Sequence, residues 1–152
     1  MSVTDLKPEN LLYLTPEADS SLVLADFGIA KMLDSKEAIL TTMAGSLGYA
    51  APEIMEKKGH GKPVDIWSLG VITYTLCCGY SPFRSERPED MVEEIKTRGI
   101  VFHDKYWKDV SSDAKDFILT LLRTNPASRP TAQVGPEWPS FACPKHNQML
   151  TY

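Results

Sequence analysis

The chain has 152 residues, of which 43% are hydrophobic, as is ordinary for one compact domain that can bury a core. Its formal net charge of -4 at pH 7 disfavours a module that binds nucleic acid by neutralising phosphates. No apolar stretch is long enough to cross a bilayer, so we expect a protein of the cytosol or nucleus without a membrane partner.

Two short strands are predicted near the start of the chain. The apolar runs at residues 11–14 and 21–24 flank a turn-like segment, a pattern that predicts a β-hairpin. One polar stretch, residues 5–10, comes before the hairpin, and another, residues 26–28, comes after it. Residues 35–48 are rich in Thr, Ser and Gly and have little periodicity, so we expect a loop there.

Residues 65–78 predict the central helix of the domain. They are apolar on nearly every face, and a helix that is hydrophobic all round must be buried. The Gly-Tyr-Ser-Pro sequence at 79–82 should end this helix.

Two further helices follow the central one. Pro88 opens the first of them, which carries one apolar face. Ser111 or Ser112 can cap the N-terminus of the second, and Asn125-Pro126 ends it. This second helix has a stripe of apolar residues at the spacing of a buried helix face: Ala114, Phe117, Ile118, Leu121 and Leu122.

The pattern changes beyond Thr131. Prolines and a glycine interrupt any helix there, and the two aromatic residues have no periodic partner. We therefore expect one domain over residues 1–131, followed by a divergent and poorly ordered tail over residues 132–152.

The polar residues around the hairpin suit phosphoryl transfer from a nucleotide. This chemistry needs a base near the acceptor hydroxyl, a cation on the moving phosphate and oxygen ligands for magnesium. The Asp-Leu-Lys-Pro-Glu-Asn sequence at 5–10 offers an acid, an amine and an amide close together, and Asp26-Phe27-Gly28 adds a carboxylate. Either run by itself is usually a solvated turn or a common tripeptide, so the indication comes from their combination.

With these motifs the sequence resembles the protein kinase family. The D-x-x-x-x-N end of the family's catalytic loop, its D-F-G metal motif and its A-P-E motif match residues 5–10, 26–28 and 51–53, in the family's order. The resemblance covers residues 4–131. It implies a mainly α (α+β) fold: the C-terminal helical lobe of a kinase with a short β-hairpin, and with the N-terminal lobe missing.

The resemblance implies a role for each matched polar residue. Asp5 would be the catalytic base, and Lys7 would assist catalysis and contact the transferred phosphate of ATP. Asn10 and Asp26 would bind both ATP and Mg²⁺. Leu12 would line the floor of the adenine pocket.

Three other matched residues are structural in the family. Asp65 would cap and brace the catalytic loop, and Arg129 would form a buried ion pair with Glu53. Glu53 and Arg129 would take no part in catalysis.

The resemblance also implies the class of substrate. Lys7 and the Gly-Ser-Leu-Gly-Tyr sequence at 45–49 are typical of kinases that phosphorylate Ser or Thr in a protein or peptide. Ser46 stands in this substrate-binding segment, where the family usually has Thr. Glu9 would lie in the substrate cleft and favour a basic side chain on the target. Residues 41–45 resemble the activation loop of calcium/calmodulin-dependent kinases, in which an upstream kinase phosphorylates the threonine at the position of Thr42.

The sequence departs from the family pattern before Asp5. Val3-Thr4 replaces the family's His-Arg, and no preceding residues could form the Gly-rich loop or the Lys–Glu pair of the nucleotide site. We therefore expect this chain by itself to be inactive. It also has no basic amphipathic segment that calmodulin would bind. Two alternatives remain open: a non-catalytic lobe that docks peptides or kinases, and a truncated gene product without a function.

Overall fold

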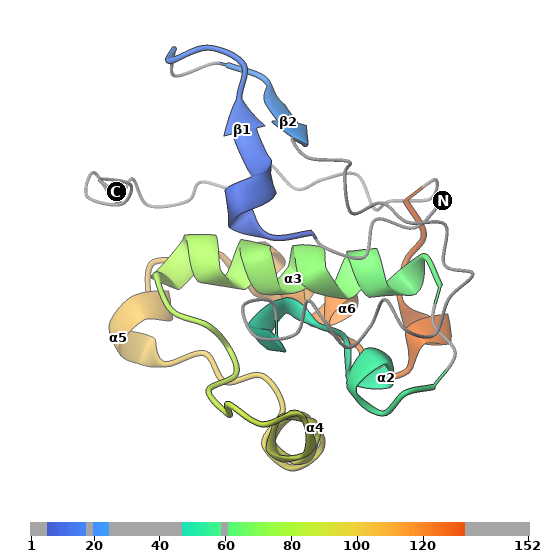
Figure 1. The fold of residues 1–152 in the computed structure, drawn as a ribbon. Helices are drawn as coiled ribbons and strands as arrows, with labels where there is room; N and C mark the ends of the chain where they lie inside the picture. Colours follow the sequence, from blue (N-terminus) through green and yellow to red (C-terminus); the bar gives the residue numbers. More distant parts are fainter. Residues whose placement is uncertain (1–5, 18–19, 25–46, 59–60, 133–152) are drawn as a thin grey trace.

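The computed structural model describes residues 6–17, 20–24, 47–58 and 61–132. In Figure 1 a two-stranded sheet lies on one side of a group of helices. The 3₁₀ turn η1 (Pro8–Asn10) leads into β1 (Leu11–Tyr13), which pairs with β2 (Leu22–Leu24). The strands are antiparallel, so the predicted hairpin is confirmed.

The helical part contains five α-helices and two 3₁₀ turns among the described residues. In chain order these are η3 (Leu47–Tyr49), α2 (Pro52–Met55), α3 (Pro63–Cys78), α4 (Pro88–Thr97), α5 (Asp104–Trp107), α6 (Ser112–Leu121) and η4 (Pro126–Ser128). The three predicted helices are confirmed as α3, α4 and α6. Proline opens α2, α3 and α4, where its missing N–H has no intrahelical partner to lose.

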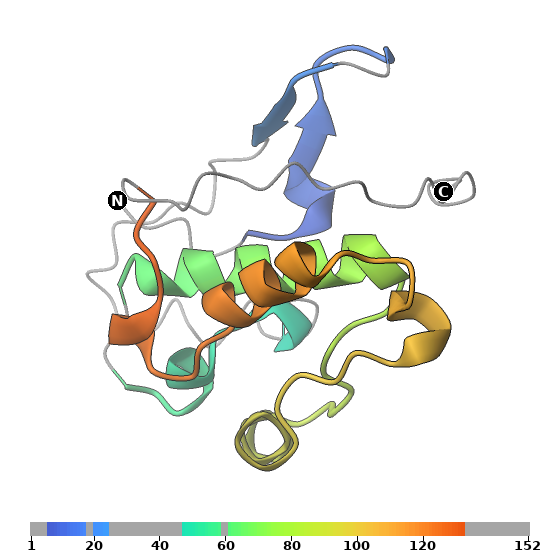
Figure 2. The same ribbon diagram turned by 180° about the vertical axis from the view of Figure 1, so that it is seen from behind.

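Helix α3 is the centre of the helical part, as Figures 1 and 2 show from opposite sides. It contacts η3, α5, α6 and η4. Val64, Trp67 and Val71 are at most 1% exposed, which confirms a buried central helix. Leu76 is 61% exposed, however, so the helix is not buried on every side. Gly79 ends the helix as predicted, in the left-handed conformation (φ 81°) that glycine adopts without strain.

Helix α6 packs closely along α3. All five residues of its predicted apolar stripe are buried. A Cβ atom at Gly70 of α3 would lie 2.8 Å from two side-chain carbons of Leu122, so only glycine allows this approach of the two helices. Of the two candidate caps, Ser111 is the one used: its Oγ accepts a hydrogen bond from the Ala114 amide at 3.2 Å.

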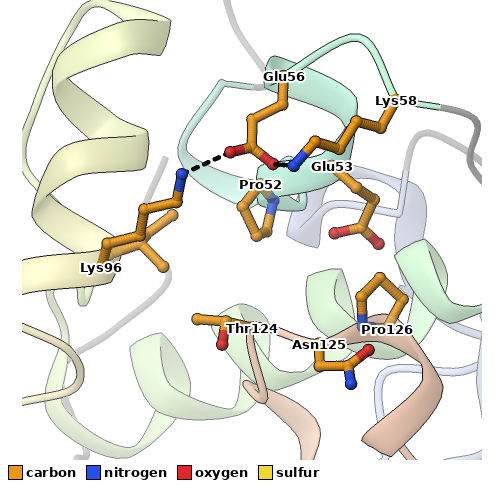
Figure 3. Close-up of a pocket in the computed structure, with 9 residues that line it drawn as sticks. Pro52, Glu53, Glu56, Lys58, Lys96, Thr124, Asn125 and Pro126 are labelled. Carbon is orange, nitrogen blue, oxygen red and sulfur yellow. Dashed lines mark hydrogen bonds and ion pairs between the residues drawn. The ribbon is translucent and has the colours of Figure 1, made fainter.

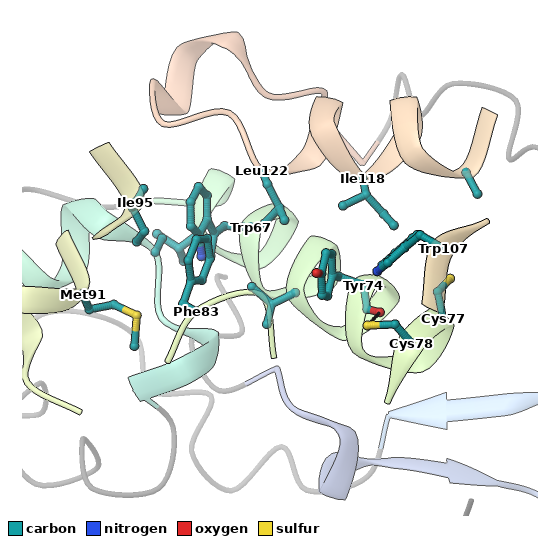
Figure 4. Close-up of a cluster of buried hydrophobic side chains, with 14 of the residues drawn as sticks. Trp67, Tyr74, Cys77, Cys78, Phe83, Met91, Ile95, Trp107, Ile118 and Leu122 are labelled. Atoms are coloured by element: carbon teal, nitrogen blue, oxygen red, sulfur yellow. Dashed lines mark hydrogen bonds between the residues drawn. The ribbon is translucent and has the colours of Figure 1, made fainter. Parts of the chain in front are cut away.

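Stacked aromatic rings join α3 to the segments that follow it (Figure 4). The rings of Trp67 and Phe83 are parallel within 7° and their centroids are 5.7 Å apart. Towards the other end of α3, the Tyr74 ring packs 4.7 Å from that of Trp107. The hydroxyl of Tyr74 donates a 2.6 Å hydrogen bond to the carbonyl of Val101, which satisfies a polar group inside this apolar cluster.

Helix α4 and the hairpin lie on opposite sides of α3 (Figure 1). Met91 and Ile95 of α4 are buried, and the helix contacts α2. The carboxylate of Glu94 accepts hydrogen bonds from the backbone amides of Arg84 and Ser85, both at 3.1 Å. These bonds fix the segment between α3 and α4.

Candidate functional site

Lys7, which is proposed for the phosphate, and Asn10, one of the two residues proposed for the metal, belong to one tight turn. Lys7 has extended backbone angles (φ -147°, ψ 159°) and precedes Pro8, the first residue of η1. The amide of Asn10 donates a 3.0 Å hydrogen bond to the carbonyl of Lys7. The turn therefore holds the backbones of Lys7 and Asn10 next to each other, just before β1.

The strand register places this turn at a defined end of the hairpin. Leu11, the first residue of β1, is paired with Leu24, the last residue of β2. Asn10 thus stands at the end from which the chain continues to Asp26. Asp5, Asp26, Thr42 and Ser46 lie outside the described residues, and their roles stay predictions.

Leu12 and Glu9 are open to contact from outside the lobe. Leu12 is 51% exposed although it lies in a strand, and Glu9 is also exposed. Other apolar side chains of the hairpin share this exposure: Tyr13 at 64%, Leu14 at 65% and Leu22 at 53%. The proposed contacts of Leu12 with adenine and of Glu9 with a substrate peptide are therefore sterically open, and they stay predictions.

The predicted ion pair between Glu53 and Arg129 is present and buried. Arg129 Nη1 lies 2.6 Å from Glu53 Oε1, and Nη2 lies 2.8 Å from Oε2, so the pair is bidentate. The two residues are 6% and 5% exposed. Such geometry gives short, charge-assisted hydrogen bonds.

All the hydrogen-bond donors of Arg129 are used. Besides its bonds to Glu53, the guanidinium donates to the carbonyls of Arg123, Pro63 and Thr124 at 2.7, 2.9 and 3.3 Å. A guanidinium has five N–H groups, and this set accounts for all of them. It also lies 5.0 Å from the centre of the Trp67 ring. Because every N–H group of the guanidinium donates a hydrogen bond, the desolvation cost of burying this charge is offset. These bonds also connect α2, α3 and η4.

Asp65 is the third residue of α3, in its first turn. An acidic side chain is favourable there because the N-terminus of a helix carries partial positive charge. Its predicted contact with the catalytic loop stays a prediction.

Two features of the structure had no signal in the sequence. The first is a cavity of about 420 Å³ between α2, α4 and η4 (Figure 3). Glu56 in its wall accepts hydrogen bonds from Lys96 at 2.6 Å and from Lys58 at 2.9 Å, and these bonds lower the pKa of its carboxyl. The second is a hydrogen bond from the hydroxyl of Ser68 to the carbonyl of Tyr49, across 19 positions of sequence.

The part of the chain that the structure describes contains neither a candidate membrane-spanning helix nor a group of three or more His, Cys, Asp or Glu side chains that could bind a metal ion. No helix there combines the length and apolar character needed to cross a bilayer. No three His, Cys, Asp or Glu side chains of that part come together as metal ligands. The magnesium site predicted at Asn10 and Asp26 stays a prediction.

Comparison with known proteins decides the family. A model of the protein kinase domain matches residues 2–138. This chain belongs to the protein kinase family. The fold class and the motifs identified from the sequence agree with this assignment.

The relatives of this kinase chain specify the group. It is 71% identical over 129 residues to the calcium/calmodulin-dependent protein kinase cmkA of Emericella nidulans, a match that covers 85% of this chain and 31% of that protein. It is 50% identical to cmkB of the same organism (84% and 32% covered) and 46% identical to human calcium/calmodulin-dependent protein kinase type 1B (85% and 37%). The resemblance to the calcium/calmodulin-dependent group is thereby confirmed. The chain spans about a third of the length of these relatives.

Proposed function

We propose that the protein to which this lobe belongs transfers the γ-phosphoryl group of ATP to Ser or Thr hydroxyls of proteins, with Mg²⁺ as cofactor. The observation that carries the proposal is the position of Lys7 and Asn10. They lie in one turn at the end of the hairpin from which the chain continues to Asp26. Membership of the kinase family supports it.

The residue types in and after this turn fit the two cofactors. Mg²⁺ prefers oxygen ligands, which the amide of Asn10 and the carboxylate of Asp26 would supply. When bound, the ion neutralises charge on the phosphates. The ammonium of Lys7 is a compact positive charge suited to a phosphate oxygen. Leu12 offers an exposed apolar side chain to the adenine ring.

Asp5 would act on the acceptor hydroxyl. Its carboxylate would take the hydroxyl proton while the hydroxyl oxygen forms a bond to the γ-phosphorus and the bond from that phosphorus to the bridging oxygen of ADP breaks. Lys7 would stabilise the negative charge on the phosphoryl oxygens in the transition state. The protein groups thus position the reactants and balance charge, without forming a covalent intermediate.

The substrate and the regulation belong to the same proposal. Ser46 and Glu9 would contact a protein substrate. Glu9 would bind a basic side chain of that substrate near the acceptor hydroxyl. An upstream kinase would phosphorylate Thr42. The names of the relatives include calcium/calmodulin dependence, and we propose this regulation for the whole protein. We also propose that the protein acts in the cytosol or nucleus.

A non-catalytic binding module is a second candidate. The exposed apolar side chains of the hairpin, Leu12, Tyr13, Leu14 and Leu22, favour it because such a group often marks a protein-binding surface. A module of this kind would bind its partner equally well with Asp5 replaced and without ATP.

The decisive experiment measures transfer of labelled phosphate from ATP to a serine peptide with basic residues, using the full-length protein. Replacing Asp5→Asn should slow transfer by roughly two to four orders of magnitude, the range for loss of a general base. Asp116→Asn is the matched control, because this aspartate is exposed on α6, and it should leave the rate unchanged. Undiminished turnover of the Asp5→Asn variant would refute the catalytic assignment.

A further inference from the structure

Ser68 differs from the other hydroxyl-bearing residues of α3. Thr73 and Thr75 each donate a hydrogen bond to the carbonyl four positions earlier in the same helix, at 2.8 and 2.9 Å. Such bonds are common for Ser and Thr within helices and fix nothing outside them. Ser68 also lies 3.2 Å from the carbonyl of Val64, but its shorter contact, at 2.9 Å, reaches the carbonyl of Tyr49 in η3.

The hydroxyl of Ser68 donates mainly to the carbonyl of Tyr49. A serine hydroxyl has a single proton to donate, so Val64 and Tyr49 share it, and the closer carbonyl of Tyr49 takes the larger part. Ser68 is 8% exposed, which leaves little room for water to replace the hydroxyl. Without the hydroxyl, the Tyr49 carbonyl would lose its hydrogen bond from α3.

The segment held by this bond leads directly to the A-P-E motif. Leu47, Tyr49 and Ala50 pack against the hydrophobic core, and Ala51 is fully buried. Glu53 follows, and its ion pair with Arg129 fixes the start of α2. Residues 50–52 therefore run between two polar anchors, one from the hydroxyl of Ser68 and one from the guanidinium of Arg129.

We infer that Ser68 is a positioning residue for the substrate-binding segment of this kinase. The inference rests on the proposed function, in which Ser46 contacts the protein substrate, and Leu47 follows Ser46 directly in the sequence. By holding the carbonyl of Tyr49 on α3, the hydroxyl of Ser68 sets the place of η3 (Leu47–Tyr49) relative to the core helix. The residue touches neither the substrate nor ATP itself. Misplacement of a segment by about 1 Å can slow a reaction by roughly a hundredfold, so one such bond suffices to matter.

Hydrogen exchange of the chain itself tests the anchor. Ser68→Ala should speed exchange of the amides of Ala50, Ile54 and Met55 by about tenfold, as expected when one hydrogen bond to a half-buried carbonyl is lost. Ser68→Thr, which keeps the hydroxyl, should restore slow exchange. Thr75→Ala is the control, because it deletes a hydroxyl that bonds only within α3. Equal exchange of these amides in Ser68→Ala and Thr75→Ala would overturn the inference.

Circular dichroism reports whether each variant is folded. Should Ser68→Ala unfold the chain, Ser68→Cys serves instead, because its thiol fills the place of the hydroxyl but is a weak donor. Faster exchange of the same three amides in this folded variant is the expected result, and exchange at the rate of the unsubstituted chain would overturn the inference.

Steady-state kinetics of the full-length protein test the positioning role. Ser68→Ala should raise KM for the peptide by about tenfold and leave KM for ATP unchanged, and Ser68→Thr should return the peptide KM to its original value. An unchanged peptide KM, or an equal change in both constants, would overturn the role. Absence of any transfer by the unsubstituted protein would instead refute the proposed function, and the exchange measurement would still decide whether Ser68 anchors the segment.

Discussion

The hairpin and the helical part of this lobe differ in how far they bury their apolar residues. In the hairpin, Leu12 and Leu22 are more than half exposed, although each belongs to a strand. In the helical part, Trp67 and Ile118 are completely buried. The two strands have three residues each, and a two-stranded hairpin of that size is marginally stable without further packing.

The residues that stabilise the fold and the residues proposed for phosphoryl transfer therefore lie in different regions. The residues that hold the lobe together, such as Glu53 and Arg129, lie in the buried helical part, whereas Lys7 and Asn10 lie beside the exposed hairpin. Segments that bind ligands are commonly those of lower local stability, because they must adjust when the ligand arrives. Substitutions in the two regions should therefore have different consequences.

The largest loss of stability should come from breaking the buried ion pair. Arg129→Ala removes one partner and leaves the carboxylate of Glu53 buried without its counter-charge, which should lower the free energy of unfolding by about 3–5 kcal/mol. Urea denaturation followed by circular dichroism measures this loss.

The control for this prediction is Arg123→Ala. Arg123 is exposed and makes one side-chain hydrogen bond, to the carbonyl of Ser128, so its loss should cost less than about 1 kcal/mol. Equal effects of the two substitutions would show that the buried pair is not the anchor.

A pair of leucine substitutions compares the two regions directly. Leu121→Ala in α6 opens a cavity in the core and should cost about 2–5 kcal/mol. Leu12→Ala in β1 removes a half-exposed side chain and should cost less than about 1 kcal/mol. The same denaturation experiment serves both variants. A loss for Leu12→Ala as large as that for Leu121→Ala would mean that the hairpin is packed as firmly as the helices.

A smaller loss than that for Leu121→Ala is expected at the N-terminus of α6. Ser111→Ala removes the side chain that accepts a hydrogen bond from the Ala114 amide and should cost about 1 kcal/mol. Ser112→Ala is a matched control, because the hydroxyl of Ser112 contacts only the neighbouring Asp113, at 3.4 Å. Thermal denaturation should separate the two variants, and a larger effect at Ser112 would reverse the assignment of the cap.

The sequence predicted the elements whose boundaries or periodicity are strong. Gly79 marks the end of α3, Pro88 marks the start of α4, and the apolar stripe marks α6. The four-residue helices α2 and α5 were missed because one helical turn is too short to establish a period. The exposure of Leu76 was also missed, since an apolar sequence does not say which of its faces is buried.

The candidate site could be predicted only in part. The ion pair between Glu53 and Arg129 joins residues 76 positions apart, and it was expected from the family resemblance, because no local pattern links the two. The bond from Ser68 to Tyr49 escaped prediction because it joins a side chain to a backbone carbonyl in another element. Contacts of this kind depend on tertiary packing, which a single sequence does not reveal.

The magnesium dependence of phosphoryl transfer tests most directly whether the turn before the hairpin carries the chemistry while the helices anchor the lobe. In the full-length protein, Asn10→Ala should raise the Mg²⁺ concentration for half-maximal transfer by about tenfold, as expected for a weakened metal site. Ser111→Ala should lower the unfolding midpoint and leave the Mg²⁺ dependence as it was. A Mg²⁺ dependence that Asn10→Ala does not change would contradict the account.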